Sequence, residues 1–100
     1  MTHYRCPVRK CDLTASSLRG LKRHYTRRHL GYCFVCDRHF KTQHGLSKHC
    51  LYRVKLDPDD RLHAAQYYLS RLRRYLVKGT WKEQVWLLGA DTLEELTKEN

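Results

Sequence analysis

Apolar residues recur at intervals of three and four along the C-terminal half of the chain. The positions in this pattern are Leu62, Ala65, Leu69, Leu72 and Leu76. The period places them on one face of a helix. Asp57 followed by Pro58 is typical of a helix start, and Gly79 is typical of a stop. The pattern therefore predicts a long helix over residues 58–78.

Two further helix starts follow this long helix. Thr80 and Glu83 have the spacing of a capping box and precede a stretch rich in aromatic and aliphatic residues. Asp91 and Glu94 repeat that spacing before the acidic stretch TLEELTKEN. We therefore expect one or two short helices that pack on the long one. The two tryptophans of this region either lie in that packing or form an interface.

Cysteines and histidines organise the N-terminal half of the chain. Four residues separate Cys6 from Cys11, twelve separate Cys11 from His24, and four separate His24 from His29. Thiolate and imidazole are the ligands of tetrahedral zinc, and this spacing lies within the range known for such sites. The segment TASSLRGLKRH, between the two pairs, offers capping residues and predicts a helix. Residues 6–29 therefore predict one complete zinc site.

This segment resembles the Cys2His2 zinc finger family, in which a β-hairpin packs on one helix around the metal. The next segment is similar to the same family, and its matches to the pattern CX2CX3FX5LX2H are Cys33, Cys36, Phe40, Leu46 and His49. The family places its fourth ligand at about 53–55, where this chain has Arg, Val and Lys. The resemblance implies two ββα fingers and two zinc ions, with the second finger one ligand short.

Three residues are candidates for that fourth ligand. Positions 49 and 63 are equidistant from position 56, and KLDPDD suits a turn, so an antiparallel helix pair would bring His63 opposite His49. Cys50 is adjacent to His49, and consecutive helical residues point about 100° apart. His44 also lies off the face of His49. We favour His63, with Cys50 next, and keep open His44 or a site with no fourth protein ligand.

The two motifs are separated by three residues only, Leu30, Gly31 and Tyr32. Three residues span at most about 10–11 Å, so we expect the fingers to pack as one rigid unit and not to follow a DNA groove separately. The predicted architecture is a small metal-bound α+β protein. Its parts are finger 1 over residues 1–31, an atypical finger 2 over 32–56 and a helical extension over 57–100.

The charge distribution along the chain indicates a class of binding partner. The 100 residues carry a formal net charge of +10. Residues 1–56 hold thirteen Lys and Arg against two Asp, whereas residues 57–100 hold seven basic against eight acidic residues. A small unit this positive attracts polyanions, of which nucleic acid is the commonest. The sequence therefore predicts that the finger region binds nucleic acid, with DNA preferred.

The expected contacts combine the family resemblance with the basic pattern. The family's docking implies that helix positions such as Arg19, Arg23 and His44 face the bases, with Gly20 and Gly45 at the central reading positions. Glycine reads no base, so we expect modest sequence specificity and affinity mainly from phosphate contacts. The predicted nucleic-acid-binding residues are Arg19, Lys22, Arg23, Arg27, Arg28, Lys41, His44 and Lys48.

These observations favour a zinc-dependent DNA-binding transcriptional regulator. Alternatives are an RNA-binding finger protein and a protein-interaction adaptor, with a protein partner or a second copy on the C-terminal helices. A metal-dependent enzyme with an open second site is remote, because no nucleophile or phosphate-loop motif is present, and we expect no enzymatic activity. Five cysteines and no signal peptide favour a reducing, intracellular setting, whether nucleus, nucleoid or a virus's host cell, without secretion or membrane insertion.

Overall fold

The structure, a computed structural model, describes residues 2–71 and 77–99. Within these residues it is a small α+β fold with four helices and five short strands. Their order is β1 (His3–Arg5), β2 (Thr14–Ala15), α1 (Leu18–Arg28), β3 (Tyr32–Cys33), β4 (Arg38–His39), α2 (Gln43–Leu56), α3 (Arg61–Ser70), α4 (Trp81–Thr97) and β5 (Lys98–Glu99).

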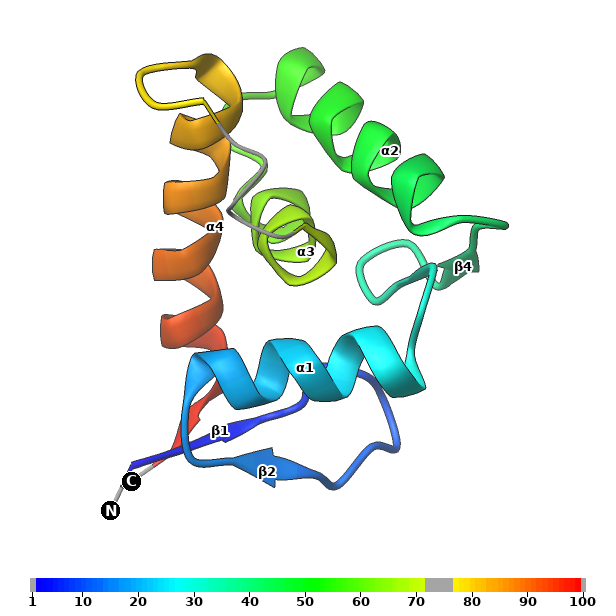
Figure 1. The fold of residues 1–100 in the computed structure, drawn as a ribbon, viewed down its shortest axis with the longest axis vertical. Coiled ribbons are helices and arrows are strands. Elements are labelled where there is room, and N and C mark those ends of the chain that lie inside the picture. Colours follow the sequence, from blue (N-terminus) through cyan, green and yellow to red (C-terminus); the bar gives the residue numbers. More distant parts are fainter. Residues whose placement is uncertain (1, 72–76, 100) are drawn as a thin grey trace.

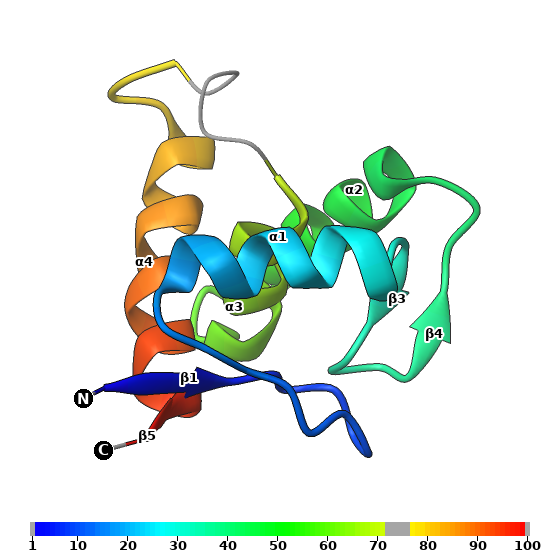
Figure 2. The ribbon, with the colours of Figure 1, turned by 60° about the horizontal axis from the view of Figure 1, so that its bottom comes forward.

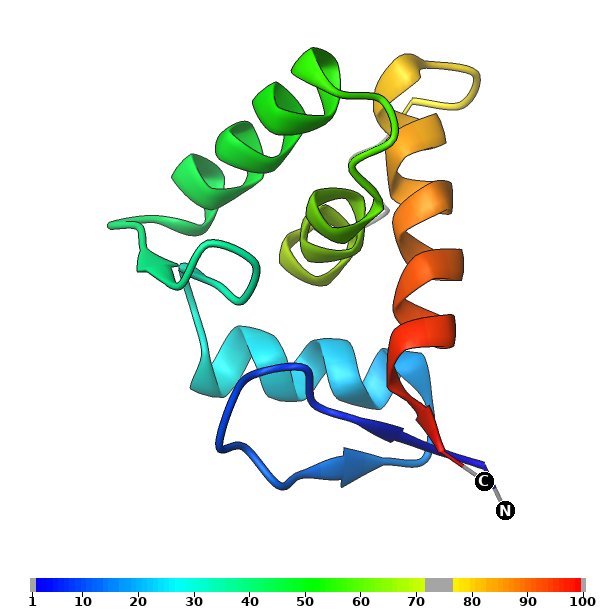
Figure 3. The ribbon, with the colours of Figure 1, turned by 180° about the vertical axis from the view of Figure 1, so that it is seen from behind.

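Helix α3 lies at the centre of the fold, and α1, α2 and α4 each pack against it. Figure 1 views α3 nearly end-on with the other helices around it, and Figure 3 shows the same arrangement from behind. Every residue from His63 to Ser70 is buried. Because α3 is covered on all sides from His63 onward, it needs no polar face, and the predicted one-sided seam describes only part of its burial. Of the predicted seam positions, Ala65 and Leu69 are buried, whereas Leu62, which precedes the covered stretch, is 44% exposed.

The long helix predicted over residues 58–78 is wrong at its start. Helix α2 continues to Leu56, and residues 57–60 form the connection to α3. The N-cap of α3 is Asp60, whose side chain accepts the backbone N–H of His63 at 3.1 Å. In Figure 1, α3 crosses α2 steeply instead of running antiparallel beside it. Helix α3 ends at Ser70, and the predicted seam residues Leu72 and Leu76 lie outside the described residues.

The one or two short helices predicted after residue 80 form a single helix, α4. Thr80 is its N-cap, as predicted, and accepts the backbone N–H of Glu83 at 3.3 Å. The second predicted start is wrong, because Asp91 lies inside α4. Helix α4 also comes unusually close to α3: a Cβ on Gly89 would lie 2.0 Å from the carbonyl oxygen of Ala64. Glycine at this position therefore sets how closely the two helices pack.

Two β-hairpins precede the two helices of the N-terminal half. Strands β1 and β2 pair antiparallel before α1, and strands β3 and β4 pair antiparallel before α2. Ser17 caps α1 and Thr42 caps α2, each by accepting a glycine N–H. Strand β5, which the sequence analysis did not predict, pairs with β1 and completes a sheet of order β2-β1-β5. Figure 2 shows β1 and β5 side by side near both ends of the chain.

Two glutamine side chains, one buried and one half-buried, join the hairpin–helix units to α3. The Oε1 atom of Gln66, on α3, accepts from the Tyr25 hydroxyl of α1 at 2.9 Å and from the Phe34 backbone N–H at 3.0 Å. Gln43, at the start of α2, accepts the Gly31 N–H at 2.9 Å and donates to the Ser70 carbonyl at 3.2 Å. The two units are therefore held together through α3.

Candidate metal centres

The first cluster of metal-ligating side chains lies between the first hairpin and α1. Cys6 and Cys11 come from the hairpin, His24 lies on α1, and His29 is the C-cap of α1. One donor atom from each of the four lies within 4.8 Å of the other three. The Sγ atom of Cys11 is 3.4 Å from Nε2 of His24. The four residues predicted for the first site are thus brought together.

The second cluster draws its donors from three elements. Cys33 and Cys36 lie in the second hairpin, His49 lies on α2, and His63 lies in the first turn of α3. The Sγ atom of Cys36 is 3.4 Å from Nε2 of His49 and 3.1 Å from Nε2 of His63. Among the three candidates for the fourth ligand, the structure therefore places His63 with the other three donors.

The two clusters share one internal geometry although their histidines have different origins. The rings of His24 and His29 are 5.0 Å apart at 79°, and those of His49 and His63 are 5.1 Å apart at 77°. The first pair comes from one helix and the second pair from two. The two ring pairs therefore have nearly the same arrangement although different backbone segments carry them. This arrangement is expected if each pair faces one central metal position.

The donor sets fit a tetrahedral metal ion. Bond lengths of about 2.3 Å to sulfur and 2.0–2.1 Å to nitrogen give a tetrahedron with edges of roughly 3.4–3.8 Å. The sulfur–nitrogen distances of 3.1–3.4 Å are close to these edges. In addition, Nε2 of His29 is buried and has no hydrogen-bond partner among the described residues. A buried nitrogen without a partner is costly, and a metal ion would satisfy it.

The protonation chemistry of the first cluster also suits a metal ion. Burial lowers the pKa of His24 and of His29, which keeps both imidazoles neutral and able to ligate. Burial raises the pKa of Cys6 to about 12, although the backbone N–H of Val8 partly offsets it. A bound divalent ion deprotonates a coordinating thiol, so it would supply the positive charge that this buried site lacks.

Asp60 orients the His63 ring. Its Oδ2 atom lies 2.7 Å from Nδ1 of His63, while its Oδ1 accepts the His63 backbone N–H. A carboxylate at Nδ1 holds the proton there and leaves Nε2 as the donor toward Cys36, an arrangement common around metal-bound histidines. The role of Asp60 was not predicted from the sequence. The signal was present in the i, i+3 spacing of Asp60 and His63, within a segment interpreted only as a turn.

The two other candidates for the fourth ligand lie elsewhere. His44 is exposed on α2, outside the second cluster. Cys50 is fully buried, and all five cysteines are free thiols. The thiol of Cys50 hydrogen-bonds to the sulfur of Cys33 and thereby lowers the pKa of Cys33 to about 5. Cys50 therefore supports the Cys33 thiolate from outside the set of four donors.

The residues predicted to contact nucleic acid lie on the helices and the loop before α2. Seven of the eight are exposed: Arg19, Arg23, Arg27, Arg28, Lys41, His44 and Lys48. Lys22 is half buried, with its ammonium 4.4 Å from the ring centroid of Tyr68 and 5.1 Å from that of Trp86. Burial lowers the pKa of Lys22 to about 8. Lys22 therefore lies over the aromatic packing between α1, α3 and α4.

Comparisons with family models, with curated proteins and with solved structures found no match to this chain. Across residues 2–71 and 77–99, no helix combines the length and apolar character required to cross a membrane. The function must therefore be inferred from the two clusters and from the charges around them.

Proposed function

We propose that both centres bind zinc and that the protein is a zinc-dependent nucleic-acid-binding protein that acts as a DNA-binding regulator of transcription. Two thiols and two imidazoles per centre favour zinc over magnesium or calcium, which prefer oxygen ligands. Four protein donors leave a tetrahedral ion no position for water or substrate. This donor count supports a structural role for the metal and a protein without enzymatic activity.

One observation carries the nucleic-acid proposal: the exposed cations of α1 and α2 have no carboxylate partners within the described part of the chain. The ion pairs found there involve Arg5, His63 and Lys98 only. Cations on a protein surface are usually interspersed with acidic groups. The unpaired arginines and lysines on α1 and α2 instead support binding to a polyanion through its phosphates.

The test is the salt dependence of binding. Zinc-loaded protein is titrated into fluorescent duplex DNA, duplex RNA and single strands at increasing salt, and binding is followed by anisotropy. Each phosphate contact on duplex DNA should add about 0.9 to the slope of log K against log salt. The double variant Arg19→Gln/Arg23→Gln should lower that slope by up to about 2. The matched control Lys82→Gln, an exposed cation of α4, should leave the slope unchanged.

A flat salt dependence, or equal loss with the control variant, would count against the phosphate-contact proposal. The choice of nucleic acid is decided by the same titrations. Tighter binding to duplex RNA than to duplex DNA would replace the DNA-binding regulator with an RNA-binding protein.

A protein-interaction adaptor is the second candidate, and one exposed aromatic residue favours it. Trp86 is buried beside Tyr68, but Trp81 is 45% exposed and lines a hollow of about 340 Å³ with Val54, Lys55 and Pro58. Sedimentation velocity tests the homodimer form of this candidate. A dimer that Trp81→Ala converts to a monomer would support it, whereas a wild-type monomer at high concentration would remove the homodimer.

A further inference from the structure

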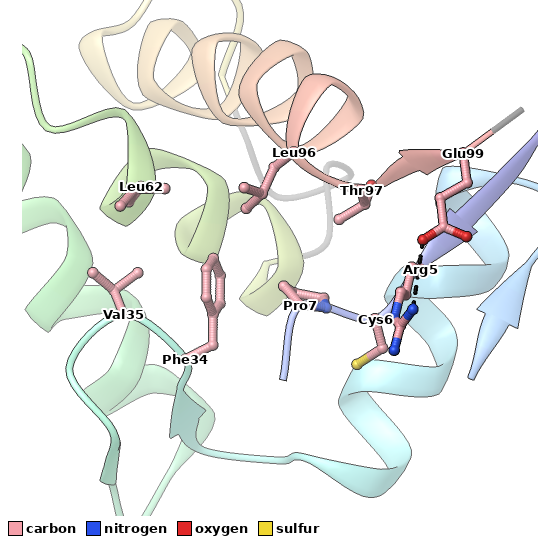
Figure 4. A pocket seen from close by; sticks show the side chains of 9 residues that line it. All are labelled: Arg5, Cys6, Pro7, Phe34, Val35, Leu62, Leu96, Thr97 and Glu99. Carbon is pink, nitrogen blue, oxygen red and sulfur yellow. Dashed lines mark ion pairs between the residues drawn. The ribbon is translucent and has the colours of Figure 1, made fainter. Parts of the chain in front are cut away.

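Two hollows adjoin the cysteine turns of the hairpins, and Pro7 and Phe34 line both of them. The first, of about 460 Å³, is mainly apolar. Figure 4 shows Phe34, Val35, Leu62 and Leu96 around it, with Arg5 paired to Glu99 at one end. The second, of about 680 Å³, also has Arg9, Lys10, Tyr32 and Asp37 in its lining. Only the second hollow therefore combines free cations with an aromatic ring and a hydrogen-bond acceptor.

The second hollow has two chemically different walls. Arg9 and Lys10 belong to the first hairpin, are exposed, and have no carboxylate partner within residues 2–71 and 77–99. Tyr32 and Asp37 belong to the second hairpin. The Tyr32 hydroxyl donates to Oδ1 of Asp37 at 2.6 Å, which holds the ring and the carboxylate together. One wall is therefore cationic, and the facing wall is aromatic with a fixed acceptor.

The two walls are close enough to act on one ligand. Arg9, Lys10, Tyr32 and Asp37 all line this one hollow, and its volume of about 680 Å³ lies in the usual range of small-ligand sites, roughly 300–1,000 Å³. Next to Tyr32, the Gly31 carbonyl accepts the Phe40 N–H at 2.7 Å, and this bond holds together the hairpin that carries the aromatic wall.

We propose that this hollow binds one unpaired nucleotide of a nucleic-acid strand, with its base against Tyr32 and its phosphate on Arg9 and Lys10. The inference deepens the proposed nucleic-acid function and depends on it. A nucleotide matches the two walls of the hollow, because it carries a flat aromatic base for the Tyr32 wall and an anionic phosphate for the cationic wall. Stacking on aromatic side chains next to a cationic surface is the usual way proteins hold single strands.

The acceptor on the aromatic wall selects the base. Oδ1 of Asp37 already accepts from Tyr32, and an ionised carboxylate retains further lone pairs on both oxygens. Guanine presents two adjacent N–H donors, N1 and N2, on its Watson–Crick edge, whereas adenine, cytosine, thymine and uracil offer one N–H group there. The hollow therefore favours guanine. In a duplex the same edge is already paired, so the site serves an unpaired guanine only.

The experiment compares single strands that differ by one base. Zinc-loaded full-length chain is titrated by anisotropy with an oligothymidylate of about ten nucleotides that carries one central guanine, inosine or adenine. Inosine lacks only the N2 amino group of guanine. We expect guanine to bind about five- to tenfold tighter than inosine, and annealing to the complementary strand should abolish the difference. Oligouridylate versions of the same strands show whether the sugar is distinguished.

Variants assign the effect to the two walls. Asp37→Asn should remove the preference for guanine over inosine, and asparagine tolerates the left-handed backbone of that position (φ 55°). Tyr32→Phe should weaken the preference, because the ring stays and the hydroxyl that holds Asp37 is lost. Arg9→Gln should lower the salt slope on single strands by about 0.7 without changing the preference. Lys82→Gln is again the matched control.

The outcomes separate this inference from the function on which it depends. Absence of binding to any single strand or duplex overturns both. Salt-dependent binding with equal affinity for the guanine and inosine strands overturns the inference and leaves the proposed function standing. A preference for guanine that survives Asp37→Asn also overturns it, because the selecting group would then lie elsewhere. The comparison of bases on the wild-type chain needs no variant to fold.

Discussion

His63 makes the second metal centre depend on the fold as a whole. Its three partners lie within residues 33–49, whereas His63 is on the central helix α3, where every residue from position 63 to 70 is buried. Metal bound there would link α3 to the second hairpin and to α2 directly. In the first centre all four donors lie within residues 6–29. Metal at the first centre would therefore hold residues 6–29 together, whereas metal at the second would hold residues 33–63 together.

The first prediction concerns His63 and Cys50. His63→Ala should leave the first centre loaded and weaken zinc binding at the second more than about 100-fold, because loss of a ligand costs more than the 10–100-fold typical of a residue behind one. Cys50→Ala should keep two zinc ions per chain, since Cys50 only hydrogen-bonds to the Cys33 sulfur. Zinc stoichiometry after dialysis against a weak chelator measures both.

The opposite zinc stoichiometries for the two variants would contradict this prediction. One zinc ion in Cys50→Ala and two in His63→Ala would make Cys50 the fourth ligand. X-ray absorption of the wild type gives an independent reading, because the proposed centres hold two sulfur and two nitrogen donors each.

Glycine controls the contact between α3 and α4 at the element scale. In most exposed helices a change from glycine to alanine is favourable, by up to about 1 kcal/mol. At Gly89 the added Cβ would lie 2.0 Å from the Ala64 carbonyl oxygen, a backbone atom that cannot move aside alone. The same Cβ would lie 3.1 Å from the Cβ of Tyr68. The sign of the substitution should therefore reverse at this position.

The second prediction compares two helical glycines. Gly89→Ala should lower the free energy of unfolding by about 3 kcal/mol, because α4 must move off α3. Gly20→Ala, in α1, should be neutral or raise it by about 0.5 kcal/mol, because its Cβ meets only the Ser17 hydroxyl at 3.3 Å and the Ala15 side chain at 3.6 Å. Chemical denaturation of the zinc-loaded proteins measures both. Equal effects would show that Gly89 does not set the helix spacing.

The start of a helix could be predicted from the sequence where a side chain caps backbone N–H groups of the helix's own first turn. Thr80 caps α4 as predicted, because capping depends on residues three apart. The division of residues 57–100 into helices was less accurate. Asp57 and Asp60 are both suitable N-cap residues for the helix that follows. Asp60 is the one that caps α3, because its side chain accepts the backbone N–H of His63, and α3 is buried from His63 onward. Pairing of β5 with β1 has no local signal, since the partners are more than ninety residues apart.

Two candidate metal centres and a buried central helix define the whole molecule. A structural zinc ion would contribute an apparent binding free energy of about 10–16 kcal/mol at each centre, whereas a domain of this size has about 5–15 kcal/mol of net stability. The spacing of cysteines and histidines was enough to predict seven of the eight donors, because tetrahedral coordination constrains it. His63 was favoured on the basis of an antiparallel helix pair that does not form, since α3 crosses α2 steeply (Figure 1). The shared support on α3 could not be predicted in the same way, since it depends on buried contacts such as those of Gln66.

The third prediction follows because the free energy of zinc binding is at least as large as the net stability of a domain of this size. Removal of zinc by a strong chelator should unfold the protein, with loss of the helical circular dichroism signal and of the cooperative thermal transition. Readdition of two equivalents of zinc should restore both, whereas magnesium should not, because its preferred ligands are oxygens. An unchanged thermal midpoint after complete removal of the metal would contradict the structural role proposed for both centres.

The pairing of β1 with β5 has a consequence for synthesis of the protein. At 5–20 residues per second, residue 98 leaves the ribosome roughly 5–20 s after residue 5. Once residue 63 has emerged, the nascent chain carries every donor of both centres, but α4, which covers α3, and β5, which pairs with β1, are still missing. Zinc supplied at that stage of translation would therefore load an open scaffold, and α4 and β5 would close over it later.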